Sequence, residues 1–241
     1  MYTEKVKWKP DEAAFCLNEA FPDGLEAVIF DLDGTLADTE CLYRRFWVEA
    51  ARDLGFPMED RHALMIRSMS PAYAEPLLRR EVCENFDYHA VRAHRRVIME
   101  AFIDEHGVKP KAGARLALET AKKLGVRTGL ATATPEARAK KVLKLLGLED
   151  YLDAYACGDM VQKGKPEPDL YLLALQKLGA AATRSIGVED SPTGIRSAKA
   201  AGLFPVMIPD QDEPGEQVKA ACGLILPSLA ALADAIQKAK R

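Results

Sequence analysis

Short apolar runs that alternate with helix-forming stretches most constrain how this chain can fold. The first run, residues 27–30 (Ala-Val-Ile-Phe), ends abruptly in the polar string Asp-Leu-Asp-Gly-Thr at 31–35. A run that is apolar at every position is typical of a strand buried on both faces, as in a parallel sheet. Similar runs predict further strands at residues 126–131, 185–188, 204–208 and 224–226, with a short one near Tyr155.

Helix-forming stretches separate most of these runs. Helices are predicted over residues 114–124 and 170–178. Two more are predicted after Thr134-Pro135 and Ser191-Pro192, because a capping residue followed by proline is typical of a helix start. Strands alternating with helices of about 10 to 15 residues indicate right-handed βαβ units. We therefore expect an α/β fold, a doubly wound, Rossmann-like parallel sheet with helices on both faces.

Residues 39–106 interrupt this alternation, because they contain no convincing strand and are rich in helix formers. We expect them to form an inserted helical cap domain, with residues 1–38 and 107–241 forming the α/β catalytic core. The segment before the first strand has no chemical signature, and its Trp8 and Phe15 are expected to pack on the core or on a partner.

Composition restricts the partners that this chain can have. The formal net charge is only -3 and no tract is dominated by lysine or arginine, which gives no support to a nucleic-acid or anionic-membrane partner. No apolar run approaches the length of a membrane span, and the N-terminus lacks the apolar stretch of a signal peptide. The five cysteines are scattered without a C-x-x-C pair, so we expect reduced thiols in a cytoplasmic protein. The oligomeric state, monomer or small homo-oligomer, stays open.

Polar side chains follow the predicted strands, where an open parallel sheet binds its ligands. They are Asp31, Asp33, Thr132, Glu189 and Asp190, joined by Lys165 from a loop. Several carboxylates at one place repel each other unless a cation lies among them. Oxygen ligands favour Mg²⁺, which in turn prefers phosphate oxygens as further ligands. The sequence therefore predicts a magnesium site for a phosphorylated small molecule.

Each residue type suits a step of phosphoryl transfer. Asp31, kept ionised by the metal, can attack phosphorus and form an aspartyl-phosphate, while Asp33 can protonate the departing oxygen. Lys165 and the Thr132 hydroxyl can bind the equatorial phosphoryl oxygens. A lone D-x-D pair is a weak signal because acidic pairs are common in turns, so the prediction depends on all four motifs occurring together. Thr134 and Ser191 are expected to be only helix caps.

Four strings together resemble the haloacid dehalogenase superfamily. They are D-L-D-G-T-L at 31–36, A-T-A-T at 131–134, G-K-P-E-P-D at 164–169 and G-V-E-D-S-P at 187–192. The resemblance spans about residues 25–209 and is strongest to the branch with β-phosphoglucomutase and small sugar-phosphate phosphatases, in which a helical cap follows the first strand.

The resemblance implies a catalytic role for each matching residue. Asp31 would be the nucleophile and Asp33 the general acid and base. Thr132, Ala133 and Lys165 would hold the phosphoryl group.

The resemblance also implies the ligands of Mg²⁺. Asp31 and Asp190 would bind the ion directly, Asp33 through its backbone carbonyl, and Glu189 directly or through water. The dehalogenases of this superfamily lack the second aspartate and use no magnesium, so Asp33 argues against dehalogenation.

Two departures from the mutase pattern favour a phosphatase over a mutase. Tyr43 stands where that pattern has a histidine, and residues 67–71 match the second phosphate site poorly. Tyr43 is a candidate substrate contact, because its predicted helix leads out of the catalytic loop. We expect a phosphatase for a small, sugar-phosphate-like monoester; the alternatives are a sugar phosphomutase and a non-catalytic module that binds phosphorylated ligands.

Overall fold

The computed structural model describes residues 21–67, 69, 71–210 and 214–239. The chain divides into two compact units, one of Met1–Ala37 with Lys109–Arg241 and one of Asp38–Val108. The second unit corresponds to the expected insertion at 39–106, and its role as a cap stays a prediction. The expected packing of Trp8 and Phe15 lies outside the described residues.

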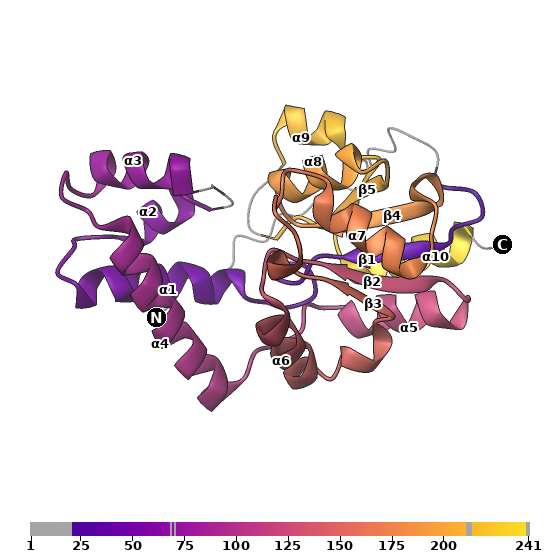
Figure 1. The fold of residues 1–241 in the computed structure, drawn as a ribbon, viewed down its shortest axis with the longest axis horizontal. Coiled ribbons are helices and arrows are strands. Elements are labelled where there is room, and N and C mark those ends of the chain that lie inside the picture. The colour runs from indigo at the N-terminus through magenta and orange to yellow at the C-terminus, as the bar shows by residue number, and fades with distance from the viewer. Residues whose placement is uncertain (1–20, 68, 70, 211–213, 240–241) are drawn as a thin grey trace. The chain divides into compact units, whose positions relative to one another are not determined.

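The first unit contains a parallel sheet of six strands in the order β3-β2-β1-β4-β5-β6 (Figure 1). The strands are β1 (Ala27–Phe30), β2 (Arg127–Ala131), β3 (Ala154–Ala156), β4 (Ser185–Glu189), β5 (Phe204–Met207) and β6 (Leu224–Ile225). Every predicted apolar run forms a strand, and the predicted α/β fold class is confirmed.

The register of the central strands aligns the loops that follow them. Phe30 of β1 is in register with Leu130 of β2 and with Val188 of β4. These three strands therefore end at the same edge of the sheet, and the residues after them lie at that edge. The topology thus places the first, second and fourth polar motifs together.

Helices cover both faces of this sheet. They are α5 (Ala114–Lys123), α6 (Glu136–Leu146), α7 (Asp169–Leu178), α8 (Pro192–Ala200), α9 (Glu216–Ala221) and α10 (Leu229–Ala239), with short 3₁₀ helices η1 (Glu149–Tyr151), η2 (Gly158–Met160) and η3 (Ala182–Arg184). Ala27 and Ile29 pack in one apolar cluster with residues of α7 and α8. Successive side chains of a strand point to opposite faces, so Val28 and Phe30, which are also buried, face the other layer. Helices α5 and α10 pack against each other.

One predicted helix cap is confirmed and the other is wrong. Ser191 is the N-cap of α8, where its Oγ accepts a hydrogen bond from the Gly194 N–H at 3.1 Å. Helix α6, however, begins at Glu136 with Pro135 as its N-cap, and no side chain caps it. Thr134 lies outside the helix because its hydroxyl bonds to Asp33 instead.

Helices are the only regular secondary structure among the described residues of the second unit. It contains α1 (Glu40–Asp53), α2 (Asp60–Met65), α3 (Pro71–Glu81) and α4 (Tyr88–His106). Helices α1 and α4 pack together, and the Arg95 guanidinium of α4 lies 4.7 Å from the Tyr43 ring centroid and 4.8 Å from that of Trp47. Across the described parts of the chain, no helix has the length and apolarity that a bilayer crossing requires.

Candidate active site

Asp31 stands directly after the central strand β1. Its backbone N–H continues the sheet by donating to the Val188 carbonyl at 3.0 Å, and its side chain is 10% exposed. Beyond it the chain turns sharply at Gly34, whose φ of 86° lies in the left-handed region that glycine adopts readily. The strand thus fixes the Asp31 carboxylate at the sheet edge, and Asp33 lies two residues further along, just before the turn.

Lys165 bridges two of the predicted site carboxylates. Its Nζ donates to Asp31 Oδ1 at 2.7 Å and lies 2.5 Å from Glu189 Oε1, with only 9% of its side chain exposed. The loop before α7 therefore reaches the edge formed by β1 and β4. Three residues from distant parts of the sequence form one compact ionic group.

Glu189 ends β4 and is fully buried. The Tyr171 hydroxyl of α7 donates to its Oε1 at 2.8 Å, and the Ser191 hydroxyl lies 3.4 Å from its Oε2. A buried carboxylate needs such partners, because removing it from water without them is costly. Lys165, Tyr171 and Ser191 together hold this carboxylate in a defined orientation.

Carboxylate oxygens of Asp31, Glu189 and Asp190 all lie within 4.8 Å of one another. When ionised, these three groups exceed the single charge of Lys165 by two negative charges. A divalent cation matches both that excess and the all-oxygen donor set. The residues therefore fit Mg²⁺. The side chain of Asp33 is not among these oxygens, so its predicted contribution through the backbone carbonyl stays a prediction.

The surrounding charges and burial shift the pKa values of both Asp31 and Lys165. Burial raises the pKa of Asp31 to about 7 against the attraction of Lys165, and the charges of Glu189 and Asp33 add to the rise. Burial lowers the pKa of Lys165, but the attraction of Asp31 and Glu189 is stronger, so its pKa rises above the ordinary value. Lys165 is therefore permanently charged, and additional positive charge would favour ionised Asp31.

Asp33 is held by a different set of groups. The Thr134 hydroxyl donates to Asp33 Oδ2 at 2.6 Å, and Arg138 Nη1 of α6 lies 3.7 Å from Asp33 Oδ1. Sequence reasoning missed Arg138 and Tyr171 and gave Thr134 only a capping role. A tyrosine within an apolar helix was a usable signal, since a buried hydroxyl requires a partner.

The remaining predicted residues have more varied settings. Thr132 is 1% exposed, and its Oγ1 accepts a hydrogen bond from the Thr134 N–H at 3.1 Å. Ala133, the next residue, is exposed. Tyr43 belongs to the helical unit, on α1. Contact of these three residues with a phosphorylated ligand stays a prediction.

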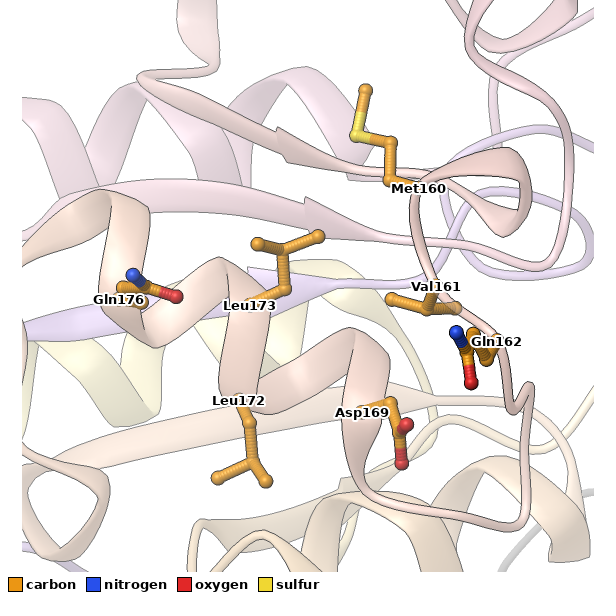
Figure 2. A pocket seen from close by; sticks show the side chains of 7 residues that line it. All are labelled: Met160, Val161, Gln162, Asp169, Leu172, Leu173 and Gln176. Carbon is orange, nitrogen blue, oxygen red and sulfur yellow. The ribbon is translucent and has the colours of Figure 1, made fainter.

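A separate depression lies beside α7 (Figure 2). Its lining comprises Met160, Val161, Gln162, Asp169, Leu172, Leu173 and Gln176. Only one of these side chains, Asp169, is charged, and none belongs to the cluster of Asp31, Glu189 and Asp190. The depression therefore has neither the cation-binding oxygens nor the lysine that distinguish the edge of the sheet.

Known proteins share this sequence pattern and fold. A family model described as haloacid dehalogenase-like hydrolase matches residues 25–202. A phosphorylated carbohydrates phosphatase from Thermotoga maritima is 38% identical over 184 residues, which cover 74% of this chain and 82% of that protein.

Solved structures agree with this match. The crystal structure of CbbY from Rhodobacter sphaeroides in complex with phosphate has a TM-score of 0.69 at 28% identity, covering 87% of this chain and 99% of that one. A β-phosphoglucomutase from Clostridium difficile has a TM-score of 0.71 and covers 90% of this chain and 97% of that one. Its identity is 24%, so this second likeness concerns the fold alone.

Proposed function

This chain belongs to the haloacid dehalogenase-like hydrolase family, and we propose that it is a magnesium-dependent phosphatase for small, sugar-phosphate-like monoesters. The observation that carries the proposal is the convergence of Asp31, Glu189 and Asp190 around an edge that also holds the Lys165 ammonium. The relative from Thermotoga maritima, named for phosphorylated carbohydrates, supports the substrate class.

The proposed reaction has two displacements at phosphorus. In the first, an Asp31 oxygen forms a bond to phosphorus, the bond from phosphorus to the ester oxygen breaks, and Asp33 gives that oxygen its proton. In the second, a water oxygen forms a bond to phosphorus, the bond from phosphorus to the Asp31 oxygen breaks, and Asp33 takes a proton from that water. Inorganic phosphate leaves, and both aspartates return to their starting states.

The neighbouring groups stabilise the charge that develops on the phosphoryl oxygens. Lys165 supplies a fixed ammonium beside Asp31, and Thr132 and Ala133 would bind equatorial oxygens of the phosphoryl group. A magnesium ion held by Asp31, Asp190 and Glu189, with the Asp33 carbonyl, would supply further positive charge at those oxygens. Tyr171 and Ser191 contribute by orienting Glu189.

Replacement of the nucleophile tests the proposal. Asp31→Asn keeps the size of the side chain but removes the attacking oxygen's charge. We expect phosphate release from hexose phosphates and from p-nitrophenyl phosphate to fall by at least about a thousand-fold. Asp23→Asn is the matched control, because Asp23 is exposed and precedes the opposite end of β1. Near wild-type turnover by a folded Asp31→Asn protein would refute the assignment.

The same assay separates the phosphatase from its alternatives. Phosphorus NMR of a hexose 1-phosphate, incubated with and without a hexose bisphosphate, should show inorganic phosphate as the main product. Faster conversion into the isomeric hexose phosphate would instead establish a mutase. Saturable binding of phosphorylated metabolites, without release of phosphate from any of them, would establish a non-catalytic binding module.

A further inference from the structure

The Asp33 carboxylate is engaged at both oxygens by groups from the segment between β2 and α6. Thr134 Oγ1 donates to Oδ2 at 2.6 Å, and Arg138 Nη1 lies 3.7 Å from Oδ1. Arg138 Nη1 also donates to Thr134 Oγ1 at 3.4 Å. The three side chains thus form a closed triangle rather than a single ion pair.

The helix that carries Arg138 is anchored in the core of the first unit. Arg138 lies in the first turn of α6, and that helix is packed against the core through Ala139, Val142, Leu143 and Leu146. The side chains of Arg138 and Asp33 are only 20% and 16% exposed, so bulk water screens their attraction less than at an open surface. The Thr134 hydroxyl is fixed from both sides, as donor to Asp33 and as acceptor from Arg138.

We propose that Arg138 is a positioning residue that orients Asp33 for proton transfer to the leaving oxygen, acting directly and through Thr134. This inference rests on the proposed phosphatase function. A general acid must lie within hydrogen-bond reach of the atom that it protonates, and small displacements of a catalytic group cost large factors in rate. Without Arg138, the Asp33 carboxylate would lose the cation beside Oδ1, while the Thr134 hydroxyl would still donate to Oδ2.

The expected consequence depends on the leaving group. An alkoxide is a poor leaving group, so cleavage of a sugar phosphate needs its proton. A dinitrophenolate leaves readily without one, so the first displacement on its ester is nearly indifferent to the position of Asp33. The second displacement is the same for both substrates, so the comparison is made on the first. A purely structural defect in α6 would slow the first displacement of both substrates alike.

The test compares Arg138→Ala with the wild type on a hexose 6-phosphate and on 2,4-dinitrophenyl phosphate. Single turnovers with enzyme in excess report the first displacement as release of hexose or of dinitrophenolate. For the sugar phosphate we expect this rate to fall about 10- to 100-fold, less than the roughly 100- to 10,000-fold that general acid catalysis supplies, because Asp33 itself is retained. For the aryl ester it should fall about 3-fold or less, since its leaving group needs no proton. Thr134→Val should show the same selective loss, and Arg138→Lys should restore part of it. Lys140→Ala is the control, because Lys140 pairs with Glu136 on the exposed side of the same helix.

Asp33→Asn separates the two possible failures. If Asp33→Asn slows the first displacement of both substrates equally, Asp33 is not the general acid and the proposed function needs revision. If Asp33→Asn slows it selectively for the sugar phosphate while Arg138→Ala slows it equally for both substrates or for neither, only the positioning role of Arg138 is overturned.

Discussion

The space around Glu189 depends on the absence of a side chain at Gly194. A Cβ atom built on Gly194 would lie 1.9 Å from Glu189 Cδ and from its Oε2. No other residue type leaves that space empty. The glycine in the first turn of α8 therefore allows the buried carboxylate to reach Lys165 and Tyr171.

Gly194→Ala should consequently damage the site although alanine is the better helix former. The helix itself gains about 1 kcal/mol from the change, but the added methyl group must displace the Glu189 carboxylate from its partners. We expect activity to fall more than about ten-fold, with weaker Mg²⁺ dependence and a lower Tm, since several charge-assisted hydrogen bonds are lost. Activity titrations against Mg²⁺ and thermal unfolding measure both effects.

Gly215→Ala provides the matched comparison. Gly215 is the N-cap of α9 with a φ of −67°, and no atom lies within 4 Å of a Cβ built there. It should behave like the wild type in both measurements. Wild-type activity and Mg²⁺ titration in Gly194→Ala would show that Glu189 does not need its present position.

The sequence identified the site residues that lie at or directly after the end of a strand. Asp31 and Glu189 each terminate an apolar run or follow it directly, so the parallel topology alone placed them at one edge. Tyr171 and Arg138 reach the site from helices, and their contacts depend on how those helices pack. Hydrophobic periodicity indicates which face of a helix is buried, but not which polar group a side chain on that face will meet.

At the scale of elements, the start of α5 is packed unusually closely against α10. Gly113, the N-cap of α5, has a φ of 86°, and a Cβ built there would lie 2.5 Å from the backbone nitrogen of Ala230. The backbone of Ala230 cannot move aside as the end of a flexible side chain can. The contact between these two helices, which cover one face of the sheet, therefore requires glycine.

Gly113→Ala should separate α5 from α10 and destabilise the fold. Gly125→Ala is the matched control, because Gly125 also has a positive φ, 69°, but nothing within 4 Å of its Cβ position. Both variants incur the conformational penalty of about 1 kcal/mol, and only Gly113→Ala adds the clash, which we expect to cost a further 1–3 kcal/mol. Urea unfolding of the two variants measures the difference; equal losses of stability would show that α10 adjusts freely.

Element boundaries followed from the sequence wherever a local signal sets them. The predicted strand at 185–188 is observed as Ser185–Glu189, and the predicted helix at 170–178 as Asp169–Leu178. The predicted N-cap of α6 was wrong because two interactions competed for the Thr134 hydroxyl. A threonine before proline suits an N-cap, but here the hydroxyl bonds to Asp33, a residue 101 positions away in the chain.

At the scale of the whole molecule, the order of the strands brings three of the four motifs to one edge of the sheet. Strand β1 is central, with β2 and β4 on either side, so the loops after all three strands adjoin. The sequence predicted that these loops share one edge of a parallel sheet, although it did not predict the order of the strands. The electrostatic cost of the arrangement is a property of the folded chain, since it arises only when the carboxylates are buried together.

That cost predicts how stability depends on pH and on magnesium. The pKa of Asp31 rises from 3.8 to about 7 on folding, so the folded state holds a proton that the unfolded chain has lost between these values. Stability of the wild type in chelator should therefore fall as pH rises from about 4 to about 7 and stay low above that range. Mg²⁺ should reverse the loss at pH 8, because an ion that binds only the folded state stabilises it by about 2.7 kcal/mol at a hundred times its Kd.

Asp31→Asn should be more stable than the wild type in chelator at pH 8, although we expect it to be inactive. The amide removes the buried negative charge, and a rise of this size in pKa, which already includes the attraction of Lys165, corresponds to about 4 kcal/mol. The advantage should shrink at pH 5, where Asp31 is protonated in the folded wild type, and it should also shrink in Mg²⁺. Calorimetric Tm values of both proteins at the two pH values, with EDTA or Mg²⁺, measure these differences. A wild type that is the more stable protein in EDTA at pH 8 would show that Lys165 alone balances the carboxylates and that their cluster does not require a cation.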